Sequence, residues 1–207
     1  MPVTKAVIPA AGFGTRFLPA TKSVPKEMLP VVDMPTIQYV VEECVESGIT
    51  DILMVIGKGK HALEEHFYSS RELEKRLEDN EQFALLKKVR RISEMADIHF
   101  VWQKELNGLG DAVSHGRTFV GNDPFALLLG DTILKGSDSS QSILQQMLEI
   151  HDAKNASVVA LEEVDRDRVS RYGIAGGTNI TDNLLALDQI VEKPSAEEAP
   201  SNMAVAA

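Results

Sequence analysis

Short apolar segments that alternate with amphipathic segments of helical period restrict the fold of this chain more than any other feature of its sequence. We predict strands at residues 6–10, 51–56, 98–103, 125–129, 158–162, 172–175 and 184–191. We predict helices at residues 35–47, 61–67, 72–89, 109–119 and 142–154. Strands that alternate with helices form right-handed crossovers and a mostly parallel sheet. The predicted fold class is therefore α/β, with a Rossmann-like, mostly parallel mixed sheet flanked by helices.

The length and charge of the chain limit its class. A chain of 207 residues can bury a core of its own, and we predict a single domain over residues 1–207. The net charge of −10 argues against a nucleic-acid partner, because nucleic-acid binders neutralise phosphates with a basic face. No apolar run is long enough to span a membrane, and the first residues lack the pattern of a signal peptide. The single cysteine, Cys44, allows no internal disulfide, and together these features predict a cytoplasmic protein.

A glycine-rich loop follows the first predicted strand, where residues 10–16 read AAGFGTR. Two glycines let the backbone approach a ligand, and successive backbone N–H groups can surround an anion. Arg16 adds a planar cation suited to phosphate. The loop lacks the Walker A pattern, and the bulky Phe17 excludes a dinucleotide-binding fingerprint. An isolated Gly-x-Gly is more often a structural turn, so this loop alone leaves a phosphate site and a plain turn both open.

The segment after this loop is rich in proline and carries two lysines. Residues 19–30 read PATKSVPKEMLP. Prolines stiffen a chain and favour extended backbone, so we expect a stiff segment that presents Lys22 and Lys26 at low entropic cost. Taken by themselves, these two lysines are explained better by a solvated surface loop.

Residues 12–33 resemble a known family. The GxGTR pattern at residues 12–16, followed by PK at 25–26 and MLPV at 28–31, resembles the signature of sugar-phosphate nucleotidyltransferases. The longer run FLPATKSVPKEMLPVVD at residues 17–33 is similar to the bacterial-type UTP–glucose-1-phosphate uridylyltransferases in particular. The resemblance extends over the whole chain and implies the nucleotidyltransferase fold. Met34 departs from the pattern, because this family usually carries lysine there.

The resemblance implies a UTP site in the first two thirds of the chain. Arg16 and Lys26 are implied to contact the triphosphate, and Gln103 can offer a paired donor and acceptor to the edge of uracil. Asp111 stands where the family more often has histidine, so its role is open. The residues implied to bind the nucleotide are Ala10, Ala11, Gly12, Gly14, Thr15, Gln103 and Gly108.

Asp131 follows the apolar strand predicted at residues 125–129. A carboxylate at the end of a strand can hold Mg²⁺, and it can equally cap a helix or a turn, so the residue alone leaves both open. The resemblance implies that Asp131 is the metal ligand and that Mg²⁺ is the cofactor.

The sugar-phosphate half is implied by YGI at residues 172–174 and VEKP at 191–194. The family pattern places the Gly173 backbone and Glu192 at the glucose hydroxyls, and Lys193 at the phosphate of glucose 1-phosphate. The implied reaction joins UTP and glucose 1-phosphate to give UDP-glucose and pyrophosphate, and the resemblance also implies a homo-oligomer. The residues implied to be catalytic are Arg16, Lys26, Asp131 and Lys193.

Two alternatives stay open at the level of sequence. One is a sister enzyme that uses dTTP or another nucleotide with the same fold and metal chemistry. The other is a nucleotide- or sugar-binding fragment with little turnover, because residues 201–207 form an apolar run without a polar stop and the family is considerably longer. On that view we expect an unfinished strand with an exposed edge at residues 203–207, UTP binding that exceeds turnover, and a chain shortened at its C-terminus.

Overall fold

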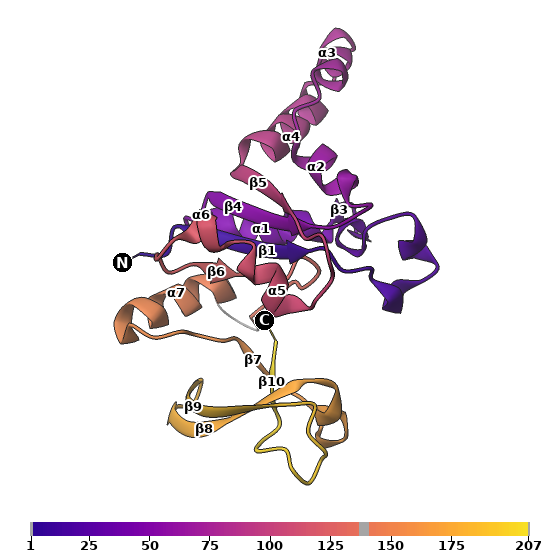
Figure 1. The fold of residues 1–207 in the computed structure, drawn as a ribbon. Helices are drawn as coiled ribbons and strands as arrows, with labels where there is room; N and C mark the ends of the chain where they lie inside the picture. Colours follow the sequence, from indigo (N-terminus) through magenta and orange to yellow (C-terminus); the bar gives the residue numbers. More distant parts are fainter. Residues whose placement is uncertain (1, 137–140, 207) are drawn as a thin grey trace. The chain divides into compact units, whose positions relative to one another are not determined.

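A computed structural model describes residues 2–136 and 141–206 of the chain (Figure 1). The chain divides into two compact units, residues 1–146 and 147–207, each with a sheet of its own. The parallel sheet of the first unit is flanked by helices, so the α/β prediction is confirmed. That residues 1–207 act as one domain stays a prediction.

Within the described residues, the sheet of the first unit has four parallel strands in the order β5-β4-β1-β6. These strands are β1 (Lys5–Ala10), β4 (Asp51–Ile56), β5 (Asp97–Trp102) and β6 (Ala126–Leu127). Ala10 is paired with Ile56, and Ile56 is paired with Trp102, so three of the strands end in one row. The loops that leave this row therefore begin side by side, at the edge where parallel sheets bind ligands.

Helices cover both faces of this sheet because β1 and β4 are apolar on both sides. Helix α1 (Thr36–Glu46) covers one face with a buried apolar stripe. Helices α5 (Leu109–Ser114) and α6 (Arg117–Val120) cover the other, where Val7 and Val55 of the sheet pack with Ala112 and Val120. The buried residues of the α1 stripe are Ile37, Val40, Val41 and Cys44.

Two of the predicted helices are each divided in two. The helix predicted at residues 72–89 is α3 (Arg71–Asp79) and α4 (Phe83–Glu94), because Glu81 adopts a left-handed conformation with φ of 56°. Both helices project away from the sheet (Figure 1). The helix predicted at residues 109–119 is α5 and α6, because the backbone bonds of His115 and Gly116 reach back three residues instead of four. Charge and leucine content did not reveal these breaks.

The strand predicted at residues 125–129 is wrong in its length and its environment. Only Ala126 and Leu127 pair with β1, and Leu127 is 38% exposed. We expected a strand covered on both faces, but within the described residues β6 lies at the edge of the sheet.

The proline-rich segment between β1 and α1 is a series of tight turns and not the extended chain that we expected. It contains three 3-10 turns and a small hairpin before α1, and α2 (His61–Phe67) follows β4. These short elements are η1 (Thr15–Phe17), η2 (Ala20–Lys22), η3 (Lys26–Met28), β2 (Pro30–Val31) and β3 (Met34–Pro35).

The second unit contains an antiparallel sheet in the order β7-β10-β8-β9. Its strands are β7 (Leu161–Glu163), β8 (Gly173–Thr181), β9 (Leu184–Glu192) and β10 (Met203–Val205). The 3-10 segment η4 (Arg166–Arg171) precedes β8, and α7 (Ile143–Lys154) spans the boundary of the two units. The core of this unit consists of Val164, Val169, Ile174, Ala199 and Ala204.

The exposed strand edge expected at residues 203–207 is wrong for the residues that the structure describes. Strand β10 pairs with β7 on one side and with β8 on the other, so both of its edges are hydrogen-bonded. Ala207, the last residue of the predicted run, lies outside the described residues.

Among residues 2–136 and 141–206, none of the helices combines the length and the apolar character that crossing a membrane requires.

Candidate functional site

The candidate site begins at the row where β1, β4 and β5 end. The backbone N–H of Gln103 donates to the carbonyl of Ile56 at 2.8 Å, which holds the residue after β5 against the end of β4. A Cβ added to Gly57 would lie 3.0 Å from the carbonyl oxygen of Ala11. The glycine-rich loop follows β1, and Gln103 follows β5. Both therefore leave the sheet from the strands that pair with β4.

The glycine-rich loop packs against the side chain of Lys26. Gly14 has a φ of 65°, and a Cβ at this position would lie 2.9 Å from the Cβ of Lys26. The hydroxyl of Thr21 donates to the carbonyl of Gly14 at 2.8 Å and fixes the turn. Ala10 and Ala11 are buried beneath the loop, whereas Gly12 and Thr15 are exposed. The loop thus presents exposed backbone next to a lysine.

Lys26 joins the glycine-rich loop to the residue that follows β6. Its Nζ donates to Asp131 Oδ2 at 2.6 Å, across 105 positions of sequence. Both side chains are partly exposed, at 21% and 28%. Two residues that the sequence implied for phosphate and metal are therefore in contact, and both can be reached from solvent.

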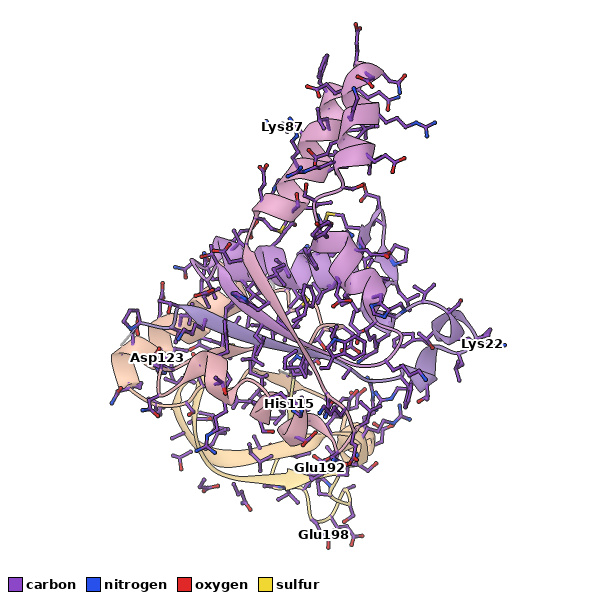
Figure 2. All side chains as sticks on the ribbon, turned by 45° about the horizontal axis from the view of Figure 1, so that its top comes forward. Lys22, Lys87, His115, Asp123, Glu192 and Glu198 are labelled. Atoms are coloured by element: carbon purple, nitrogen blue, oxygen red, sulfur yellow. The ribbon has the colours of Figure 1, made fainter. Side chains whose placement is uncertain are left out.

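The other two cations of this region differ from Lys26. Arg16 lies in η1 and is exposed, and it forms no ion pair with any of the described residues. Lys22, labelled in Figure 2, points outward from the loop into solvent. Lys26 alone of the three is packed within the site, while Arg16 is free to meet an anion.

Sequence reasoning missed a buried ion pair directly below these residues. Glu27 is completely buried, and its Oε2 accepts a hydrogen bond from Lys60 Nζ at 2.7 Å. Its other oxygen, Oε1, has no hydrogen-bond partner among the described residues and lies 3.8 Å from Lys26 Nζ. Burial raises the pKa of the Glu27 carboxyl, and the hydrogen bond and charge of Lys60 oppose that rise.

The four charged residues form one chain of alternating sign: Lys60, Glu27, Lys26 and Asp131. They come from the loops after β4, β1 and β6, so the chain ties three neighbouring strand ends together. The sequence could have indicated Lys60 by its position just after a buried strand, because parallel sheets bind ligands at this end of their strands.

Gln103 occupies a second cluster, at the start of α5. Its side chain is 4% exposed, and its Nε2 donates to Asp111 Oδ2 at 2.7 Å. The same Nε2 is 3.4 Å from the carbonyl oxygen of Gly108. The structure therefore brings the two residues implied for base recognition together with Asp111, whose part the sequence left open.

The residues implied for the sugar phosphate lie together in the second unit. Gly173 is paired with Glu192 across β8 and β9, and a Cβ on Gly173 would lie 3.3 Å from a carboxylate oxygen of Glu192. Lys193 follows with a φ of 48°, and its backbone N–H donates to the carbonyl of Tyr172 at 2.9 Å. Lys193 Nζ lies 3.2 Å from Glu192 Oε1, so the carboxylate and the ammonium point to one place.

The residues present fit a magnesium ion that is shared with a phosphate ligand. Within the described residues, no group of three or more His, Cys, Asp or Glu side chains could hold a metal on its own. Mg²⁺ commonly takes only one or two protein carboxylates and completes its shell with water and phosphate oxygens. Asp131, partly exposed beside the glycine-rich loop, supplies such a carboxylate.

Comparison with known families and proteins agrees with this arrangement. The model of the nucleotidyl transferase family matches residues 5–207. The UTP–glucose-1-phosphate uridylyltransferase of Bacillus subtilis (strain 168) is 48% identical over 203 residues, which are 98% of this chain and 68% of that relative.

Two solved structures are similar over almost the whole chain. A UTP-bound UGPase from Acinetobacter baumannii is 41% identical with a TM-score of 0.92, over 99% of this chain and 72% of that chain. A UDP-glucose pyrophosphorylase complexed with UDP-glucose is 42% identical with a TM-score of 0.86, over 98% of this chain and 74% of that chain.

Proposed function

Because this chain belongs to the nucleotidyl transferase family, among its UTP–glucose-1-phosphate uridylyltransferases, we propose how its own residues carry out the reaction of that group. The chain transfers a uridylyl group from UTP to glucose 1-phosphate and gives UDP-glucose and pyrophosphate. The resemblance carried by residues 12–33 is thereby confirmed. The relatives favour UTP over dTTP, since those at 48% and 41% identity are named for UTP.

The chemical difficulty of this reaction is charge. A phosphate oxygen of glucose 1-phosphate attacks the α-phosphorus of UTP in line, and this nucleophile is already an anion near neutral pH. It requires no general base, so catalysis depends on positioning and on neutralising two polyanions. Arg16 and Lys26 contact the triphosphate, and Lys193 contacts the phosphate of glucose 1-phosphate.

The glycine-rich loop and Gln103 hold the nucleotide. The backbone of the exposed Gly12 and Thr15 and of the partly buried Gly14 faces the phosphates, and the buried Ala10 and Ala11 form the floor below. Gln103 and the backbone of Gly108 meet the edge of uracil. In the second unit, the Gly173 backbone and Glu192 meet the glucose hydroxyls. The support for these roles is the grouping of each set at the end of its strands.

Asp131 is the residue that would hold Mg²⁺ through its carboxylate. When bound there, the ion supplies charge stabilisation to phosphate oxygens of the nucleotide. Lys26 contacts the Asp131 carboxylate at 2.6 Å. When UTP binds, its triphosphate becomes a second anion beside the Lys26 ammonium. We further propose that the enzyme works in the cytoplasm, where a free thiol such as Cys44 stays reduced, and that it forms a homo-oligomer.

The contact between Lys26 and Asp131 carries this proposal, because it unites the implied phosphate ligand with the implied metal ligand. We expect Asp131→Ala to lower turnover by about a thousandfold while leaving the fold intact, since metal-assisted charge stabilisation contributes several kcal/mol. Pyrophosphate release from UTP and glucose 1-phosphate, measured over a range of Mg²⁺ concentrations, tests this expectation.

Asp123→Ala is the matched control. Asp123 is also an acidic residue of the first unit, but it forms an exposed ion pair with Lys5 at 2.9 Å and lies in no part of the site. It should retain the turnover of the parent protein. Near-normal turnover of Asp131→Ala at limiting Mg²⁺ would remove Asp131 from the role of metal ligand.

A further inference from the structure

We propose that Asp111 fixes the side-chain amide of Gln103 with its oxygen facing the nucleotide base, and that it thereby selects uracil against cytosine. This inference rests on the proposed role of Gln103 at the base. It gives a function to Asp111, a residue that does not itself touch the base and acts only through Gln103. In the terms of the reaction, Asp111 is a positioning residue that determines specificity.

The neighbours of the Gln103 amide decide its orientation. Nε2 lies 2.7 Å from Asp111 Oδ2 and 3.4 Å from the carbonyl oxygen of Gly108. A carboxylate and a carbonyl can only accept hydrogen bonds, so the amide NH₂ has to face them and the amide oxygen has to face away. The opposite orientation would place an oxygen against two other oxygens in a site where Gln103 is 4% exposed.

The amide oxygen is thus left for a ligand. Among residues 2–136 and 141–206, no group donates a hydrogen bond to Gln103 Oε1, whereas the NH₂ group has two acceptors beside it. Among the described residues, Glu27 Oε1 is the one fully buried polar side-chain atom without a partner, so Gln103 Oε1 is not sealed from solvent and a ligand can donate to it. Gln103 therefore offers an acceptor to the base, and not the paired donor and acceptor expected from the sequence, because its NH₂ group already faces Asp111 and Gly108.

Asp111 itself is held firmly enough to impose this choice. It lies in the first turn of α5, and its backbone carbonyl accepts hydrogen bonds from the Ser114 hydroxyl at 2.7 Å and from His115 at 2.9 Å. The backbone of Gln103 is anchored separately, through its N–H to Ile56. The two side chains therefore meet between two fixed backbone segments.

A hydrogen-bond acceptor at this position distinguishes uracil from cytosine, the two pyrimidine bases of RNA nucleotides. The N3 atom of uracil carries a hydrogen and can donate to Gln103 Oε1, whereas N3 of cytosine is an acceptor and would face another acceptor. Turning the amide to suit cytosine would set its oxygen against Asp111. A site built to accept a hydrogen bond rejects an analogue that cannot donate one, because a buried polar atom is left unpaired.

By the same geometry, Asp111 does not distinguish uracil from thymine. Thymine carries the same N3–H group as uracil, so Gln103 Oε1 receives both bases equally. The deoxyribose and the methyl group of dTTP are read by other contacts. Removing Asp111 should therefore change the preference for UTP over CTP and leave the preference for UTP over dTTP as it is.

The experiment compares the parent protein with Asp111→Ala in pyrophosphate release with glucose 1-phosphate as acceptor. UTP and dTTP serve as substrates, and CTP serves both as a substrate and as a competitive inhibitor of UTP. In Asp111→Ala only the 3.4 Å contact with the Gly108 carbonyl still holds the Gln103 NH₂ group, so the amide can turn. We expect the kcat/KM of CTP relative to that of UTP to rise by about tenfold or more. The ratio of UTP to dTTP in kcat/KM should stay within about twofold of its parent value.

Two further variants separate positioning from structure. Asp111→Asn keeps the shape and an oxygen that can accept from Gln103, so we expect a smaller gain of CTP than in Asp111→Ala. Ser114→Ala removes one of the two hydrogen bonds to the Asp111 carbonyl but keeps the Asp111 carboxylate and the His115 contact, so its UTP to CTP ratio should stay close to that of the parent.

The outcomes are distinct. If Asp111→Ala lowers the use of UTP and CTP by the same factor, Asp111 has only a structural role and the inference is wrong. The inference is equally wrong if the kcat/KM of CTP relative to UTP rises no more in Asp111→Ala than in Ser114→Ala. A parent protein that releases no pyrophosphate from UTP would instead contradict the proposed function itself, which is a different result from an unchanged ratio.

Discussion

Gly14 is the residue at which backbone conformation and close packing coincide. Its φ is 65°, and an added Cβ would lie 2.9 Å from the Lys26 Cβ, closer than such atoms normally approach. We expect Gly14→Ala to lose about 1–2 kcal/mol of folding free energy from the left-handed backbone and also to push Lys26 away from its place beside the loop. UTP binding should weaken by about tenfold, measured by calorimetry in the presence of Mg²⁺.

Gly48→Ala separates these two effects. Gly48 follows α1 with a φ of 83°, and apart from its own chain neighbours no atom of the described residues lies within 4 Å of the Cβ that alanine would add. The variant should therefore show a comparable loss in urea unfolding but normal UTP affinity. Equal UTP affinities of the two alanine variants would mean that the packing of Lys26 against the loop has no bearing on the nucleotide.

At this scale, sequence motifs predicted the residues that stand out chemically and missed those that support them. Lys26 and Asp131 were singled out by their motifs, but their contact could not be predicted, because the apolar pattern gave the end of β1 correctly and overestimated β6. Glu27 was missed because a carboxylate beside a lysine in a proline-rich loop has no signature of burial, yet it is fully buried. Burial of a charge depends on contacts with residues far away in sequence, here with Lys60.

At the scale of elements, the ion pair of Glu27 and Lys60 connects η3 to the loop after β4. Removing one partner leaves a buried charge uncompensated, and we expect Glu27→Gln to lose about 3–5 kcal/mol of folding free energy. The double variant Glu27→Gln with Lys60→Met removes both charges and should recover most of that loss, since neutral replacements of buried pairs are often tolerated. Urea unfolding of the parent and of the single and double variants measures the difference.

Lys75→Ala is the control for this expectation. Lys75 and Asp79 form an ion pair on α3 at 3.1 Å, but their side chains are 75% and 59% exposed. Exposed pairs contribute little, so this variant should unfold close to the parent. A double variant that is no more stable than Glu27→Gln would show that the two charges do not compensate each other.

Elements with a strong period were predicted well, and those interrupted by a local turn were not. Helix α1 and strands β1 and β4 match their predicted ranges to within a residue or two, because each has an uninterrupted apolar face. The break between α3 and α4 depends on one residue, Glu81, in a left-handed conformation that its type does not announce. Strand β6 was overestimated because an apolar run gives no information on how many neighbours it pairs with.

At the scale of the whole molecule, the implied residues fall into two groups along the chain. Those for the nucleotide and the metal belong to the unit of residues 1–146, and those for the sugar phosphate belong to the unit of residues 147–207. Each group is assembled by the sheet of its own unit, a parallel one in the first and an antiparallel one in the second. The residues predicted to bind UTP and those predicted to bind glucose 1-phosphate therefore belong to different sheets.

This division predicts that two lysine variants act on different substrates. Lys26→Ala removes the cation beside the glycine-rich loop, and Lys193→Ala removes the one that follows β9. A charge-assisted hydrogen bond contributes about 1.5–3 kcal/mol, so each variant should raise one KM by about tenfold or more. We expect Lys26→Ala to raise the KM for UTP, and Lys193→Ala to raise the KM for glucose 1-phosphate.

Initial rates of pyrophosphate release, measured with each substrate varied in turn at saturating levels of the other, separate the two effects. Lys22→Ala is the control, because Lys22 points outward from the same loop and should leave both KM values unchanged (Figure 2). If Lys26→Ala and Lys193→Ala both raised the KM for the same substrate and spared the other, the two units would not divide the substrates as proposed. Because Lys26 also contacts Asp131, its replacement should lower kcat in addition, and this second effect should be absent from Lys22→Ala.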